Sequence, residues 1–196
     1  MTNSNRLRCR LKGGLRCAAV LILVMVVIFG LGCVGQSDYD TNKEVPTGDP
    51  PFPPQKVYGI VDPNHILSDE TVRESEAILE NLKKDGIAEV VILVQPGVKH
   101  PQDYATRYGR YIELGEKEKN NGLVWLIRPD IRPEEFRITN SVGRGLPQLT
   151  SSDLGEIMED AADSINFGNY DDGVLRIVKG TDQKLRQIYK VKEVRK

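Results

Sequence analysis

The chain has 196 residues and a formal net charge of −1, a length that suits one domain with a hydrophobic core and an added segment. Residues 1–37 carry five basic residues and no acid, so the rest of the chain is mildly acidic, which argues against a nucleic-acid partner. All three cysteines lie within the first 33 residues, which excludes a disulfide framework and a cysteine nucleophile in the rest of the chain.

Residues 1–33 are typical of a membrane anchor or an export signal. The apolar run 18–31 follows the basic residues, and the helix from Cys17 to Cys33 would span about 25 Å, just short of a ~30 Å hydrocarbon core. The positive charges predict a cytoplasmic N-terminus and a domain on the outer, extracytoplasmic face of the cell membrane. Gly30-Leu31-Gly32-Cys33 resembles a lipoprotein processing box, which would lipidate Cys33; the alternative is a retained transmembrane helix.

A proline-rich linker is expected over residues 34–55. It has no apolar periodicity and could extend on the order of 60 Å at ~3.1 Å per residue. It holds five of the eleven prolines but no PxxP motif with a basic neighbour, so a spacer is favoured over a recognition motif. We expect a globular domain over residues 56–189 and a basic tail over residues 190–196.

The first half of the domain reads as two strand–helix pairs. A short extended piece starting at residue 57 stops at Asp62-Pro63, and Ser68 is the expected N-cap of a helix with one apolar face. The EVVILV segment at residues 89–94 predicts a fully buried strand. Pro101 opens a second helix, whose tyrosine stripe we assign to the core rather than to an aromatic binding platform.

The second half reads as a hairpin followed by two helices. Residues 123–128 and 136–139 predict two strands folded back on each other. A capping box from Thr150 to Asp153 starts an amphipathic helix with an acidic face that we assign to solvent, and a last helix follows Gly173. The order β-α-β-α-β-β-α-α predicts an α/β fold, a sandwich with helices on both faces of a mixed sheet.

Two groups of residues could carry function. Gly143-Arg144-Gly145 follows the hairpin and precedes a helix, a position where open α/β sheets bind ligands. Asp62 ends the first strand, and Asp171 and Asp172 lie in a turn at a helix start. Such carboxylates either hold a hard cation such as Ca²⁺ or only cap a helix and anchor a turn. The sequence contains no GxSxG elbow, no Walker loop, no paired histidines and no complete dinucleotide fingerprint.

From Val57 to Leu185 the sequence resembles the TPM domain family, which includes a thylakoid-lumen acid phosphatase, a photosystem II repair protein and a nematode receptor modulator. The segments that carry the resemblance are, in order, Val61–Ser68, Tyr104-Ala105, Leu114-Gly115, Asn121–Ile127, Arg137-Ile138, Val142–Leu146, Phe167 and Tyr170–Gly173. The chain departs from the family pattern at Ile112, where relatives have an aromatic residue, and at Pro147, where an acid is frequent. Two extra residues also precede Val142.

The resemblance implies a three-layer α/β/α sandwich with about four strands and a divalent cation, Ca²⁺ or alternatively Mg²⁺, near the Asp and Gly-x-Gly loops. On this basis Asp62 with Asp171 or Asp172 would be carboxylate ligands, and Gly143–Gly145 would shape the pocket rim. We expect a membrane-tethered binding module that engages membrane-protein partners. The alternative is a metal-dependent phosphatase in which Arg144 pairs with a substrate phosphate, although no phosphate nucleophile is evident.

Overall fold

The structure is a computed structural model that describes residues 50–53, 58–131 and 137–190, all within the unit Asp40–Lys196. The expected anchor with Cys33, most of the linker, Phe136 and the tail beyond residue 190 lie outside these residues. The elements are β1 (Gly59–Val61), α2 (Asp69–Lys84), β2 (Glu89–Val94), α3 (Pro101–Tyr111), β3 (Gly122–Ile127), β4 (Ile138–Val142), α4 (Ser151–Asn166) and α5 (Tyr170–Lys190). Their order is the one the sequence predicts.

Four strands form one mixed sheet in the order β1-β2-β3-β4. β1 and β3 each pair with β2 in parallel, whereas β3 and β4 form an antiparallel hairpin in which Ile127 faces Ile138 and Leu123 faces Val142. The second hairpin strand therefore begins two residues later than expected and continues to Val142. The polar residues Thr139-Asn140-Ser141 do not have the apolar pattern from which a strand is predicted. They can nevertheless extend β4, because a strand at the edge of a sheet need not be apolar.

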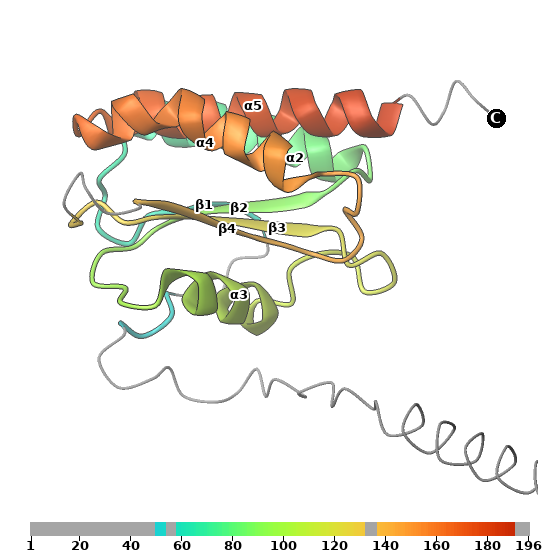
Figure 1. The fold of residues 1–196 in the computed structure, drawn as a ribbon, viewed down its shortest axis with the longest axis horizontal. Coiled ribbons are helices and arrows are strands. Elements are labelled where there is room, and N and C mark those ends of the chain that lie inside the picture. Colours follow the sequence, from blue (N-terminus) through green and yellow to red (C-terminus); the bar gives the residue numbers. More distant parts are fainter. Residues whose placement is uncertain (1–49, 54–57, 132–136, 191–196) are drawn as a thin grey trace, which may run out of the picture. The chain divides into compact units, whose positions relative to one another are not determined.

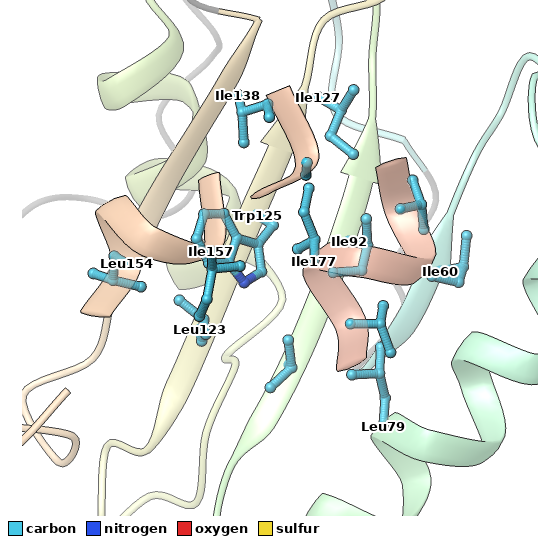
Figure 2. Packing of buried hydrophobic residues seen from close by; sticks show 14 of the residues in the cluster. Ile60, Leu79, Ile92, Leu123, Trp125, Ile127, Ile138, Leu154, Ile157 and Ile177 are labelled. Atoms are coloured by element: carbon cyan, nitrogen blue, oxygen red, sulfur yellow. The ribbon is translucent and has the colours of Figure 1, made fainter. Parts of the chain in front are cut away.

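Alternate residues of the central strands enter two separate cores, as their fully apolar sequences require. The larger core joins one face of the sheet to α2, α4 and α5, and the smaller one joins the other face to α3. Figure 1 shows the resulting three layers, with α3 alone below the sheet. In the larger core, Trp125 and Ile92 of the sheet face Ile157 of α4 and Ile177 of α5 (Figure 2). The predicted α/β/α sandwich is confirmed.

The two βαβ connections have opposite hands. Both step in the same direction across the sheet, from β1 to β2 and from β2 to β3, yet α2 and α3 cover opposite faces. One crossover is therefore left-handed, although about 98% of such connections in proteins are right-handed. The pattern of apolar residues carries no information on this point, because α2 and α3 have similar amphipathic sequences.

Local signals are confirmed at the helix ends and in the tyrosine stripe. The Ser68 side chain accepts a hydrogen bond from the Thr71 amide at the start of α2, and Thr150 with Asp153 forms the capping box of α4. Tyr104 and Tyr108 are buried in the smaller core. The acidic face of α4 is partly exposed and forms ion pairs with Lys184 and Arg176 of α5.

One buried hydrogen bond ties the sheet to α5: the indole N–H of Trp125 donates to the Thr181 hydroxyl at 3.1 Å. We expect Thr181→Val to lower the free energy of unfolding by about 1–3 kcal/mol, because it keeps the side-chain shape but leaves a buried donor unpaired. Urea unfolding followed by the fluorescence of Trp125, the single tryptophan, measures the change. The control Thr139→Val on the half-exposed β4 should stay within about 0.5 kcal/mol of the parent protein, and equal effects of the two substitutions would contradict this role.

Candidate metal centre

The loop that follows β1 wraps around the carboxylate of Asp62. The Leu67 amide donates to Asp62 Oδ2 at 2.7 Å, and the His65 amide donates to the Asp62 carbonyl oxygen at 3.2 Å. The other carboxylate oxygen, Asp62 Oδ1, is buried and has no hydrogen-bond partner among the described residues. Buried carboxylate oxygens are normally paired with a hydrogen-bond donor or a metal ion. Asp62 Oδ1 is therefore an acceptor that the described part of the protein does not satisfy.

Asp171, at the start of the last helix, contacts the same loop although it lies far from it in the sequence. Its Oδ1 accepts a hydrogen bond at 2.9 Å from the amide of Ser68, which lies 103 positions away in the sequence. Asp62 and Asp171 therefore bind the adjacent amides of Leu67 and Ser68, immediately before α2. The positive end of the α2 dipole favours both negative charges there.

Two contacts hold the start of α5 in this position. The Tyr170 hydroxyl donates to the carbonyl oxygen of Pro129, just beyond β3, at 2.9 Å. Arg137 Nη1 donates at 2.9 Å to the Ile165 carbonyl, near the C-terminal end of α4. Together they attach the α4–α5 turn to the β3–β4 hairpin, at the edge of the sheet where the parallel strands end.

Asp172 does not join this pair of carboxylates. Its Oδ2 accepts hydrogen bonds from the Ser164 hydroxyl and from Arg176 Nε, the latter at 2.7 Å. These two contacts hold the pKa of the Asp172 carboxyl below its usual value. Because consecutive helical residues point about 100° apart, only one of the two acids could reach the Asp62 loop, and it is Asp171.

The glycine-framed loop lies at the opposite edge of the sheet, and the expectation that it borders the aspartates is wrong. The Gly143 amide donates to the Gly122 carbonyl at the start of β3, and the Gly145 amide donates to the Asn120 carbonyl. The whole length of β3, roughly 17 Å at ~3.3 Å per residue, separates that end of the sheet from the other. The hairpin causes this separation, because β4 runs antiparallel and carries the chain back before the loop begins.

The comparisons with known proteins agree with this architecture. The family model of the TPM domain matches residues 60–184, well over half of the chain. The chain belongs to the TPM domain family. Among curated proteins, none matches it.

Solved structures of low sequence identity share the fold of this TPM domain. The N-terminal domain of a protein from P. gingivalis is 22% identical with a TM-score of 0.52, and the match covers 65% of this chain and 83% of that one. The BA42 protein from Bizionia argentinensis is 12% identical with a TM-score of 0.52, over 64% and 86% of the two chains. The N-terminal domain of cg2496 from Corynebacterium glutamicum is 11% identical with a TM-score of 0.50, over 74% and 88%.

The oxygen atoms at this edge of the TPM domain can be compared with the ligands that a divalent cation requires. The described part of the chain contains no group of three or more His, Cys, Asp or Glu side chains that could hold a metal ion. Two carboxylates are nevertheless compatible with Ca²⁺, which completes its shell with carbonyl oxygens and water. The orphaned Oδ1 of Asp62 is the atom that such an ion would satisfy. In the same described ranges, none of the helices is both long and apolar enough to cross a membrane.

The sequence does not predict that Ser68, Arg137 and Tyr170 contribute contacts to this end of the sheet. The sequence predicts Ser68 only as a helix cap, and Arg137 and Tyr170 belong to the family pattern without an assigned role. Their contacts join residues 28 to 103 positions apart in the sequence, so no local sequence pattern predicts these contacts. The sole local signal is that Ser68 begins a helix close behind Asp62, which brings free backbone amides to the carboxylate.

The glycine loop has a packing role that can be tested. A Cβ at Gly145 would lie 1.7 Å from the Lys119 carbonyl oxygen, whereas a Cβ at Gly155 in α4 would meet nothing within 4 Å. We expect Gly145→Ala to lower the free energy of unfolding by about 3 kcal/mol or more through this backbone clash. Gly155→Ala, the matched control, should raise it by about 0.5–1 kcal/mol because alanine favours a helix interior. Urea midpoints measure both, and a neutral Gly145→Ala would contradict the packing role.

Proposed function

We propose that the chain is an anchored TPM module, held by residues 1–33 on the outer face of the cell membrane, that binds a divalent cation and engages membrane-protein partners. Ca²⁺ is the favoured ion, with Mg²⁺ as the alternative. Asp62 and Asp171 supply its carboxylates, and Asp172 stabilises the α4–α5 turn instead. The anchor is supported by the basic and apolar pattern of the N-terminal sequence.

The observation that carries the proposal is the meeting of two carboxylates on adjacent amides, with one buried oxygen left unpaired. Two negative groups that share one loop repel each other, and a cation between them removes this repulsion. Calcium also tolerates the irregular set of carboxylate, carbonyl and water oxygens that a loop next to two helix starts can supply.

The bound ion would act on the structure of the domain. Asp62 belongs to the loop that joins β1 to α2, whereas Asp171 opens α5, the last helix. An ion on both groups would therefore tie the first part of the domain to the last. The same edge carries Phe167, which is 88% exposed at the α4–α5 turn. Cation binding would thus fix the α4–α5 turn that carries this side chain.

The phosphatase alternative loses the arginine that the sequence assigned to it. Arg144, the residue expected to hold a phosphate, is exposed on the loop at the other end of the sheet. Arg137 Nη1 donates to the Ile165 carbonyl and to the Tyr170 hydroxyl, and its buried Nε has no hydrogen-bond partner among the described residues. An open coordination position on the ion would still be needed to activate water.

Thermal unfolding of the full-length protein with and without Ca²⁺ tests the cation site. We expect millimolar Ca²⁺ to raise the melting temperature by several degrees, since an ion at about 100 times its Kd stabilises the folded state by about 2.7 kcal/mol. Asp62→Asn and Asp171→Asn should each abolish the increase, because each removes one carboxylate ligand. A shift smaller than a degree in the parent protein would refute the site.

Asp172→Asn is the matched control. This substitution also removes one negative charge from the first turn of α5. In the parent protein, however, the Asp172 carboxylate is paired with Arg176 and Ser164 and not with the Asp62 loop. The calcium-dependent shift should therefore persist in this variant. Hydrolysis of a generic aryl phosphate by the same preparations separates the alternative: metal-dependent turnover that is lost in Asp62→Asn would favour a phosphatase over a binding module.

A further inference from the structure

Phe52, in the proline-rich linker, packs onto the outer surface of α3. Its ring centroid lies 5.1 Å from that of Tyr104, 5.6 Å from that of Tyr108 and 5.1 Å from that of Tyr111. The Arg107 guanidinium carbon lies 5.9 Å from the centroid of the same ring. Such edge-on and tilted ring contacts, with a cation near the ring face, are favourable beyond the apolar area they bury.

The residues beside Phe52 take part in the same contact. The Tyr104 hydroxyl donates to the Pro51 carbonyl oxygen at 3.3 Å, and the Pro53 side chain is buried. Figure 1 shows this short segment, drawn in cyan, beside α3. Prolines on both sides of Phe52 restrict the backbone before it docks, so the segment loses less conformational freedom on binding than a glycine- or serine-rich linker would.

The contact between Phe52 and α3 is not a general property of the phenylalanines near the surface of this domain. Phe52 joins the smaller hydrophobic core with Tyr104 and Tyr108, whereas Phe167 remains 88% exposed at the α4–α5 turn. The tyrosine stripe of α3 thus has two uses, since its buried members fill the core while Tyr111, 38% exposed, extends the stripe outward to meet Phe52. The expectation that the whole linker is a free spacer is wrong for residues 50–53.

We infer that residues 50–53 form an intramolecular clamp, in which Phe52 fastens the linker to α3 and makes the chain leave the domain from the α3 face. Residues 34–49 then separate the clamp from the expected anchor, a length of chain that could reach roughly 50 Å if fully extended at ~3.1 Å per residue. Phe52 thus contacts α3, which covers the opposite face of the sheet from α2, α4 and α5. The inference concerns a different surface from the cation site and stands independently of it.

Photo-crosslinking in the full-length protein, reconstituted in lipid vesicles, tests where Phe52 lies. Replacement of Phe52 by p-benzoyl-L-phenylalanine keeps an aromatic ring at the position. We expect irradiation to join residue 52 to the peptide that contains Tyr104–Tyr111 of the same chain, as identified by mass spectrometry. Crosslinks mainly to a second copy, to lipid or to other elements would overturn the clamp.

Limited trypsin digestion of the same full-length preparation tests what the clamp restrains. Lys56 follows the clamp in the sequence and Lys43 precedes it, so cleavage after Lys43 serves as an internal reference. We expect Phe52→Ala to increase the relative rate of cleavage after Lys56 about tenfold, because the rate follows the population of the released state. Tyr111→Ala, which removes one exposed partner of Phe52 without opening the core, should increase it to a smaller extent.

Phe167→Ala makes the same chemical change at an exposed phenylalanine and should leave the cleavage ratio unchanged. The melting temperature of each variant shows whether the domain remains folded, which separates release of the linker from general unfolding. Equal cleavage ratios in the parent protein, Phe52→Ala and Tyr111→Ala would overturn the inference. Because none of these measurements uses a metal ion, failure of the calcium experiment leaves them interpretable.

Discussion

The attachment of the α4–α5 turn to the β3–β4 hairpin is the contact on which the candidate site depends. Tyr170 bonds the carbonyl beyond β3, and Arg137 bonds the carbonyl of Ile165 in α4. Since Asp171 is the residue after Tyr170, these contacts place its carboxylate beside Ser68. Without them, the two acidic turns would belong to separate parts of the chain, and neither would be more than a local cap.

The direction of β4 divides the domain into two ends with different chemistry. The parallel strands end beside Asp62, Asp171 and the start of α2, where negative groups meet backbone amides. The other end is built by close backbone packing, with Gly143 and Gly145 set against residues 119–122. In open α/β sheets the ligand crevice lies at the carboxyl ends of the parallel strands, and the antiparallel β4 delivers its glycine-rich loop to the other end of the sheet.

The two faces of the sheet also differ in what they offer. The three-helix layer of α2, α4 and α5 is tied together by the larger core and by ion pairs such as Arg186 with Asp85. The single helix α3 covers the other face and carries the end of the linker through Phe52. The linker residues that the structure describes therefore pack on the α3 face of the sheet and not on the three-helix face.

Most of the fold could be predicted because its signals are local. The apolar periods of the strands and helices, the caps at Ser68 and Thr150 and the order of the elements are all recorded within a few neighbouring residues. The same applies to the core assignment of Tyr104 and Tyr108. The unusual hand of one crossover was not predictable, since it depends on which face each amphipathic helix covers.

The sequence by itself determined the class of fold, the candidate carboxylates and a domain preceded by a basic, apolar segment and a proline-rich linker. Only the tertiary structure decided that Asp171, rather than Asp172, bonds the loop that follows Asp62, that the Gly143–Gly145 loop lies at the far edge, and that Phe52 packs on α3. Each of these outcomes depends on the direction in which a helix residue points or on a contact between distant segments. Hydrophobic periodicity predicts which residues are buried. It does not predict which residues from distant segments come into contact.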